Sequence, residues 1–241
     1  MYQEIRPAKE LSHLVQSFWT FSQGESPEGF KVLPDSCIDL VFDITQGAAV
    51  VSGVMSKYQL RVLKAQSNLV GVRFKAEHFG MLSRVPLIDT RNLRVELSQV
   101  DSNFRSTILG RLNERSQTTE NIALMEIYIK QIWSQANHEQ DQLVLSVAKK
   151  IRALKGVINA KGIATSYYIS LRQLERRFKK AIGLSLKEFA SVVRFGNAKR
   201  AISRFREKSL LAIALEAGFY DHAHMSYEFR RIASENPSAF R

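Results

Sequence analysis

The sequence predicts an α+β protein of two parts. A β-rich sandwich or barrel-like domain with a helical connector is expected over residues 1–138, and an all-α domain over residues 139–241. Short apolar runs separated by Gly, Ser and Asn fall between residues 30 and 75, which is typical of strands. Helical periodicity begins near Leu97 and continues to the end of the chain. The polar segment QANHEQD, residues 135–141, marks the expected boundary between the β-rich part and the all-α part.

The strand pattern is clearest over residues 38–44, where apolar side chains at the even positions alternate with Asp39, Val41 and Asp43. The runs AAVVSGVM, YQLRVL and LVGVRF continue it. Farther along, apolar residues recur at helical spacing, and this stripe predicts either core packing or a dimer seam. Its members are Phe104, Ile108, Leu112, Ile122, Met125, Ile129, Ile132 and Trp133.

Composition and charge narrow the function. The chain has 241 residues, of which 45% are apolar and 10% aromatic, enough for a substantial core. Residues 1–140 hold 15 Lys and Arg against 15 Asp and Glu, whereas residues 141–241 hold 20 against 8, so the net charge of +12 lies in the second part. A basic domain of this kind favours a polyanion such as nucleic acid, and the alternative is a solvated surface that serves only solubility.

Several protein classes are disfavoured. No apolar run approaches the ~20 residues that span a bilayer, and the first residues lack a signal-peptide layout, so we expect a soluble, cytoplasmic protein without a membrane partner. The single Cys37 excludes an internal disulfide and a cysteine-based zinc cluster, the five histidines show no HExxH spacing, and no metal or cofactor is indicated. Asp35 and His78 could accompany Cys37 as a nucleophilic set, but no orienting group is visible, and we expect a buried thiol.

Two segments of the basic part repeat each other, residues 161–180 and 211–231. Each has an Ile-Ala pair, a turn, and an amphipathic helix that ends in Phe and two basic residues. Helix-turn-helix units have this layout, and their second helix enters a DNA major groove. Gly218 lies where the second turn needs a positive φ, which Gly adopts easily. Tyr168 lies at that position in the first turn, which must differ or carry about 1 kcal/mol of strain.

The repeat resembles a known family. The segments SLRQLERRFKKAIGLSLKEF, RFGNAKRAI and IALEAGFYDHAHMSYEFRR followed by NPSAFR are similar to the double helix-turn-helix domain of AraC/XylS-type transcription regulators, over about residues 141–241. Family members usually have Arg, Gly and Ser where Tyr227, Ser234 and Asn236 stand. Residues 1–110 resemble the uncharacterised β-rich sensor domain of some such regulators, through SFWTF, LPDSCIDLVFDI and VGVRFKAEHFG. The resemblance implies double-stranded DNA and RNA polymerase as partners.

Helical period assigns the faces of the first recognition helix. Leu171, Leu174 and Phe178 face inward, so Arg172, Gln173, Glu175, Arg176 and Lys179 face outward. An exposed Arg can bond both guanine acceptors, and we expect Arg172 and Arg176 on base edges with Glu175 on a cytosine amino group. The resemblance implies the same three positions. Alternatively, Glu175 pairs with Arg172 or Lys179 along the helix.

The second recognition helix is less charged. With Met225 and Phe229 inward, the expected base contacts are His222, Ala223, Ser226 and Tyr227. Expected backbone contacts, each of which could instead be plain solvated charge, are Lys161, Lys179, Lys180, Arg230 and Arg231.

One helix is expected to join the two units, over residues 185–206. Its 22 residues would span about 33 Å, close to the ~34 Å repeat of DNA, so the two units could enter successive major grooves. A rigid connector of this kind favours DNA that bends easily.

The sequence therefore predicts a DNA-binding transcription regulator of the AraC type and not an enzyme. Its first part is a candidate for a small-molecule effector and for homodimerisation. Arg73, the polar member of an apolar strand, is a speculative contact for an anionic effector, but a surface ion pair is favoured. The alternatives are a DNA-modifying or repair protein, whose reactive cysteine would need a Pro-Cys-His-Arg context that Cys37 lacks, and a sequence-indifferent packaging protein.

Overall fold

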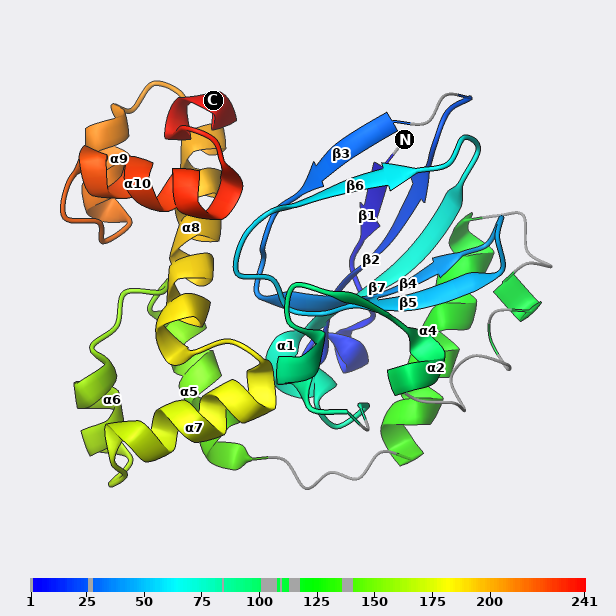
Figure 1. The fold of residues 1–241 in the computed structure, drawn as a ribbon, viewed down its shortest axis with the longest axis horizontal. Coiled ribbons are helices and arrows are strands. Elements are labelled where there is room, and N and C mark those ends of the chain that lie inside the picture. Colours follow the sequence, from blue (N-terminus) through cyan, green and yellow to red (C-terminus); the bar gives the residue numbers. More distant parts are fainter. Residues whose placement is uncertain are drawn as a thin grey trace.

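The predicted α+β organisation is confirmed by a computed structural model, which describes residues 2–25, 28–83, 85–100, 108, 110–112, 118–135 and 141–241. Figure 1 shows the strands and helix α4 on one side of the molecule and helices α5 to α10 on the other. The expected domain boundary at residues 138/139 lies outside the described residues.

A six-stranded antiparallel sheet forms the centre of the first part, and two further strands pair separately. The large sheet has the order β1 (Tyr2–Ile5), β2 (Val15–Ser22), β7 (Asn68–Lys75), β4 (Cys37–Asp43), β5 (Ala48–Ser52) and β8 (Arg94–Glu96). The small sheet consists of β3 (Glu28–Val32) and β6 (Gln59–Leu63). Strands β1, β2 and β8 extend the β-rich part beyond the expected 30–75.

Both faces of the large sheet are covered. On β4 the alternating Ile38, Leu40 and Phe42 enter the main core, as their spacing predicts. On the opposite face, Leu63 of β6 packs with Val41 and buried neighbours on β2 and β7. The small sheet therefore closes over this face, which gives the sandwich or barrel-like form that was expected.

Short helices and one long one complete this part. They are η1 (Lys9–Leu11), α1 (Ala76–Phe79), η2 (Leu87–Thr90), α2 (Leu97–Val100) and α4 (Thr118–Gln135). The apolar stripe of α4 packs into the main core, where Met125 and Ile129 have no exposed surface. Its described members are therefore core and not a dimer seam, while Phe104 lies outside the described residues. Over the described residues, no helix has the length and apolar content needed to cross a bilayer.

Residues 141–241 are helical. The elements are α5 (Gln142–Ala153), α6 (Ala160–Ser166), α7 (Leu171–Ile182), α8 (Leu186–Arg204), α9 (Leu210–Glu216), α10 (His222–Ala233) and η3 (Pro237–Phe240). Each α-helix here begins at a Ser, Asp or Asn whose side chain accepts a backbone N–H, which sets its start. Helix α8 begins directly after its cap Ser185, the first residue of the expected segment, but it ends at Arg204, two residues early, because Phe205 leaves the helical conformation.

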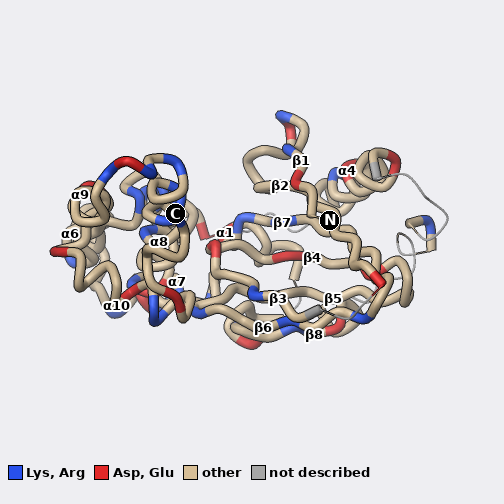
Figure 2. The backbone as a smooth tube through the Cα atoms, turned by 90° about the horizontal axis from the view of Figure 1, so that it is seen from above, with Lys and Arg blue, Asp and Glu red and all other residues tan. Residues whose placement is uncertain are grey.

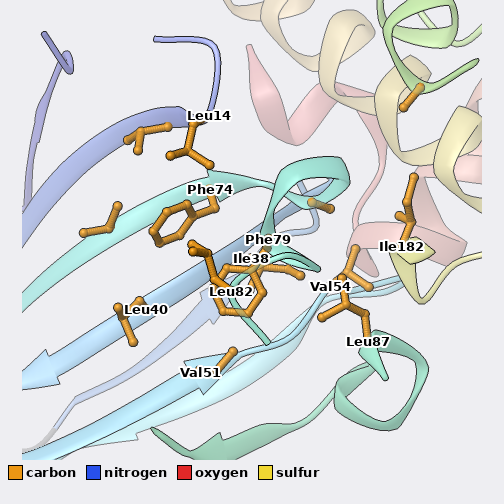
Figure 3. Close-up of a cluster of buried hydrophobic side chains, with 14 of the residues drawn as sticks. Leu14, Ile38, Leu40, Val51, Val54, Phe74, Phe79, Leu82, Leu87 and Ile182 are labelled. Atoms are coloured by element: carbon orange, nitrogen blue, oxygen red, sulfur yellow. The ribbon is translucent and has the colours of Figure 1, made fainter. Parts of the chain in front are cut away.

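The main core does not stop at the sheet. Ile182, at the end of α7, packs with Val54 and Leu87 of the β-rich part (Figure 3). The same cluster extends through α5 and α7 to Val193 of α8. A second, smaller cluster begins at Phe195 and holds α9 and α10. The first helix-turn-helix unit therefore shares its core with the β-rich part, whereas the second unit has its own.

Candidate nucleic-acid interface

The predicted repeat forms two helix-turn-helix units, α6–α7 and α9–α10. In the first turn the Ile169 amide donates to the Ala164 carbonyl at 3.1 Å, and in the second the Phe219 amide donates to the Ala214 carbonyl at 2.9 Å. The Ala of each Ile-Ala pair thus accepts the bond that closes the turn.

The strained first turn is confirmed. Gly218 has φ 77°, and Tyr168 at the matching position has φ 52°, the left-handed region that costs a residue with a Cβ about 1 kcal/mol. The Tyr168 side chain is 100% exposed, so packing does not stabilise this conformation. A Cβ on Gly218 would lie 2.3 Å from Cγ2 of Val157, so this position requires Gly for space as well as for φ.

Helix α8 holds both recognition helices through the repeat's Phe residues. Phe178 of α7 lies with its ring centroid 5.4 Å from that of Phe189, and Phe229 of α10 lies 4.7 Å from Phe195. Phe189 and Phe195 are both on α8. Phe178 and Phe229 are fully buried, as expected, and they fix which face of each recognition helix turns outward.

On α7 the expected outward residues are exposed: Arg172, Gln173, Glu175, Arg176 and Lys179. Leu171, expected to face inward, is only half-buried. Glu175 makes no ion pair with Arg172 or Lys179, all three of which are described. The side chains of Arg172 and Arg176 are therefore uncovered, and the β-rich part does not hide them.

On α10 one expectation is wrong. His222, Ala223 and Tyr227 are exposed, but Ser226 is only 8% exposed. The reason is that α10 packs against α8, α9 and η3, so that its buried face is broader than a single apolar stripe. Glu228 lies on the same buried face, where it pairs with Arg231.

The expected backbone-contact residues are exposed, but they differ in their surroundings. Arg231 Nη2 lies 2.7 Å from Glu228 Oε2, and Arg230 donates to Asn236 Oδ1 at 3.2 Å. Burial acts to raise the pKa of Glu228, but the hydrogen bond and the positive charge of Arg231 lower it by more. The pKa of Glu228 therefore lies below its usual value. Lys180 lines a cavity beside α7, described below, whereas Lys161 and Lys179 have no ion-pair partner among the described residues.

The two recognition helices share one side of the molecule. Figure 1 shows α7 and α10 crossing α8 near its two ends, and Figure 2 shows both on the same side of α8, among many Lys and Arg residues. Helix α8 has 19 residues and spans about 28 Å. This is less than the ~34 Å repeat of DNA, so α8 alone does not match two successive major grooves.

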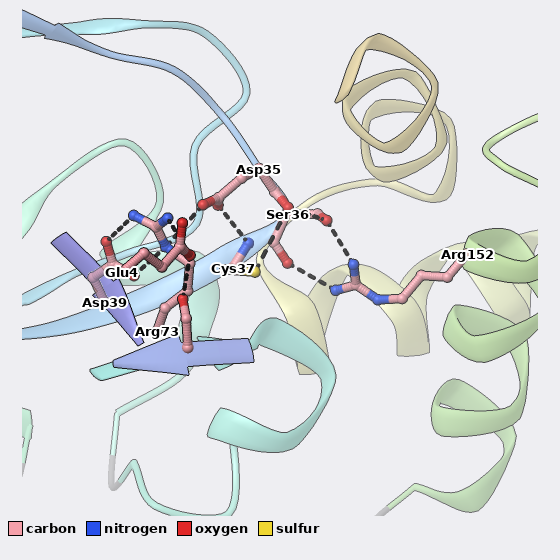
Figure 4. A network of polar contacts seen from close by, with 8 residues as sticks. Glu4, Asp35, Ser36, Cys37, Asp39, Arg73 and Arg152 are labelled. Atoms are coloured by element: carbon pink, nitrogen blue, oxygen red, sulfur yellow. Dashed lines mark hydrogen bonds and ion pairs between the residues drawn. The ribbon is translucent and has the colours of Figure 1, made fainter. Parts of the chain in front are cut away.

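A polar network lies on the face of the large sheet that the small sheet partly covers, the face opposite the main core. Arg73 on β7 makes ion pairs of 2.8 Å with Asp39 and 2.9 Å with Asp35, and Glu4 lies 3.8 Å away (Figure 4). The Arg73 side chain is only 19% exposed, so the favoured ion pair exists but is largely buried. Burial would lower the pKa of Arg73, but Asp35 and Asp39 raise it, and the guanidinium stays charged. An anionic effector would have to displace these carboxylates.

The network leads to the helical part. Arg152 on α5 donates to Ser36 Oγ at 2.9 Å and to the Ser36 carbonyl at 3.0 Å, next to Asp35 (Figure 4). It also pairs with Glu77 of α1 at 2.7 Å. Arg152, Ser36 and Glu77 were not predicted from the sequence, because none belongs to a motif. A basic residue on the inward face of α5 is the only signal they leave.

Cys37 lies beside this network without the features of a nucleophile. The thiol is buried, and burial raises its pKa well above the usual value, so it stays protonated. His78 instead contacts the rings of His13 and Trp133. The expected packing role of Cys37 is confirmed.

A cavity of about 630 Å³ lies between the β-rich part and the first helix-turn-helix unit. Met81, Val85 and Leu87 supply an apolar wall. Lys180 and the ion pair of Arg177 with Asp141, at 2.7 Å, supply the polar wall. Its size is in the range of small-molecule sites.

Comparison with known proteins gives matches to each part. Residues 163–241 match a family described as a helix-turn-helix domain, and residues 3–96 match a domain of unknown function, DUF6597. The HTH-type transcriptional activator RhaS of Pectobacterium atrosepticum is 30% identical over 84 residues, which cover 35% of this chain and 30% of that protein. RhaS of Escherichia coli O1:K1 is 32% identical over 84 residues. The chain thus matches less than a third of the length of these curated relatives.

Among solved structures, apo ToxT from Vibrio cholerae aligns over 100% of this chain and 95% of its own, with a TM-score of 0.46 and 12% sequence identity. ToxT from Vibrio cholerae O395 aligns with a TM-score of 0.44 and 13% identity, over 100% of this chain and 96% of that one.

Proposed function

Because its carboxy-terminal residues form a helix-turn-helix domain of the AraC/XylS type, we propose that this chain is a sequence-specific transcription regulator that binds double-stranded DNA. The observation that carries the proposal is that α7 and α10 lie on one side of α8 with Arg172 and Arg176 uncovered. The charge of residues 141–241, 20 Lys and Arg against 8 Asp and Glu, supports a polyanionic partner. Such a regulator would act in the cytoplasm.

In this proposal α7 supplies most of the sequence reading. Arg172 and Arg176 each bond O6 and N7 of a guanine, and Glu175 accepts from a cytosine amino group. Helix α10 contributes less, through His222, Ala223 and Tyr227, because its exposed face carries fewer charges. Ser226 is too buried for the base contact that its position in the sequence suggested.

Phosphate contacts position the two units without reading sequence. Lys161, Lys179 and Arg230 are the best placed for this role, because they are exposed and have no carboxylate partner among the described residues. Arg231 shares its charge with Glu228, and Lys180 faces the cavity beside α7. We therefore expect Arg231 and Lys180 to contribute less to DNA affinity.

We further propose that the β-rich part controls DNA binding. It shares a core with the first unit and contacts the second, so a small molecule that binds between the parts would shift the orientation of the recognition helices. The cavity is a better candidate than Arg73, because Lys180 in its wall has no ion-pair partner among the described residues, whereas the Arg73 guanidinium already has carboxylate partners. Homodimerisation through this part and contact with RNA polymerase complete the proposal.

A selection experiment tests the proposal. The full chain is mixed with random-sequence duplexes, bound fragments are enriched, and affinity is then measured for a selected site and for random duplex over a salt series. We expect the selected site to bind at least about a thousandfold more tightly, as specific regulators do. Equal affinity and equal salt slope for both duplexes would contradict the proposal and favour a packaging protein.

A further inference from the structure

The second helix-turn-helix unit has few attachments to the rest of the molecule. Its core begins at Phe195, directly after the main core ends at Val193, so the two clusters follow each other along α8. On one side, Val157 of the α5–α6 connection packs against Gly218. A helix of this length is commonly curved, so α8 and one contact at its side do not by themselves set the orientation of the second unit. A second contact elsewhere on the unit would fix its orientation.

The β-rich part supplies such a contact at the carboxyl end of α10. The Tyr58 amide donates to the Ile232 carbonyl at 2.7 Å. Lys31 Nζ lies 2.5 Å from Glu235 Oε1, and the same ammonium lies 4.9 Å from the centre of the Tyr58 ring. Leu33 packs against the second core. These contacts join β3 and the start of β6 to the end of the second recognition helix.

The turn that carries Tyr58 also touches the first unit. Gly183, which ends α7 with φ 87°, packs so closely that a Cβ there would lie 2.9 Å from Cγ1 of Val54. Arg91 donates to Ser56 Oγ and pairs with Glu188, which caps α8. Residues 53–58 therefore contact the end of α7, lie beside the start of α8 and contact the end of α10.

These contacts form a closed triangle whose corners are the β-rich part and the two units. Helix α8 spans about 28 Å, which is less than one turn of DNA. The distance between the two recognition helices therefore depends on the angle and position at which each packs against α8. We infer that Lys31 and Tyr58 determine the spacing between the two DNA half-sites that this chain accepts, by holding the end of α10 against the β-rich part. The inference rests on the proposed function and deepens it.

Charge reversal at Lys31 tests the inference. The full chain is measured on duplexes that contain a selected site with zero, one or two base pairs inserted or removed between its halves. Lys31→Glu places a second carboxylate beside Glu235 and opens the contact. We expect wild type to lose at least tenfold in affinity for each altered spacing, and Lys31→Glu to lose less than about threefold. The double variant Lys31→Glu/Glu235→Lys should restore the wild-type profile.

Lys57→Glu is the matched control. Lys57 is an exposed lysine on the turn that carries Tyr58, without an ion-pair partner among the described residues. Its reversal should change affinity evenly over all spacings and leave the profile intact. If Lys31→Glu keeps the wild-type profile, or if wild type binds all spacings equally, the inference is wrong.

A distance measurement without DNA separates this inference from the proposed function. Spin labels are placed through Thr165→Cys on α6 and Leu211→Cys on α9, both exposed, since the native Cys37 is buried. We expect a narrow distance distribution in wild type and in Lys57→Glu, and a distribution at least twice as broad in Lys31→Glu. An unchanged distribution contradicts the inference even if DNA binding is sequence-specific. A broadened one supports it even if no selected site is found.

Discussion

Arg152 of α5 and Glu77 of α1 form a bidentate ion pair, with Nε of Arg152 2.7 Å from Oε1 of Glu77 and Nη2 2.8 Å from Oε2. The Glu77 side chain is only 5% exposed, and the pair joins the β-rich part to the helical part. Arg152 also bonds Ser36, so one side chain ties the start of β4 and the segment after β7, two central strands of the sheet, to α5. The contact explains why the two parts form one unit although their compositions differ.

This pair predicts a pH dependence. Burial alone would raise the pKa of Glu77, but the hydrogen bonds and charge of Arg152 lower it below its usual value. A lowered pKa in the folded state means stability that is present above the unfolded value and lost as pH falls through the folded value. We therefore expect the free energy of unfolding to fall below about pH 4.5 more steeply in wild type than in Glu77→Gln. Urea titrations at several pH values measure this, and identical profiles would contradict it.

The shared core predicts that a change on α7 destabilises the sheet. Ile182→Ala leaves a cavity between α7 and the β-rich part and should cost about 2 to 5 kcal/mol. Both tryptophans, Trp19 and Trp133, lie in the β-rich part, so their fluorescence reports its unfolding in urea. The control is Ile213→Ala, a similar cavity in the second core, which should shift the tryptophan transition less. An unshifted transition in Ile182→Ala would show that the parts unfold independently.

An alanine substitution should destabilise the second turn much more than the first. Gly218→Ala adds a Cβ at φ 77° and against Val157, and it should cost about 2 to 4 kcal/mol through strain and overpacking. Tyr168→Ala replaces a fully exposed side chain that already has φ 52°, so stability should change by less than about 0.5 kcal/mol. Thermal unfolding of the two variants gives the comparison. Equal losses in the two variants would contradict the predicted difference between the turns.

The short connector predicts a preference for flexible DNA. Because α8 spans about 28 Å against the ~34 Å repeat, the duplex has to bend toward the protein for both units to enter major grooves. Sites with a TA or CA step between the halves should bind several-fold more tightly than sites with an A-tract there. Gel-shift titrations with matched half-sites measure the ratio. Equal affinity, or tighter binding to the A-tract, would contradict a bend.

Local patterns account for what the sequence predicted correctly. The Ile-Ala pairs, the Phe residues and the alternation in β4 each recur at a fixed spacing, which is why both turns, the buried faces and the central strand could be located. Strands β1 and β8 are short, at 4 and 3 residues, and too brief to show a period.

Contacts between distant segments explain the rest. Ser226 is buried because three elements surround α10, which no periodicity within the helix reveals. The pair of Arg152 and Glu77 joins residues 75 positions apart, and that of Lys31 and Glu235 joins residues 204 apart. Charged residues at such separations have no shared motif. The attachment of the helical units to the β-rich part therefore required the structure.

Methylation interference on a selected site tests the central claim most directly, because methyl groups on guanine N7 block the major-groove contacts assigned to α7 and α10. For wild type we predict two groups of interfering positions on one face, about 10 base pairs apart. Arg172→Ala should abolish the interference at one guanine within one group and weaken binding by about 5- to 150-fold. The control is Arg206→Ala, which changes an exposed arginine away from both recognition helices and should leave both groups intact. A single group, or a pattern that Arg172→Ala does not change, would contradict the account.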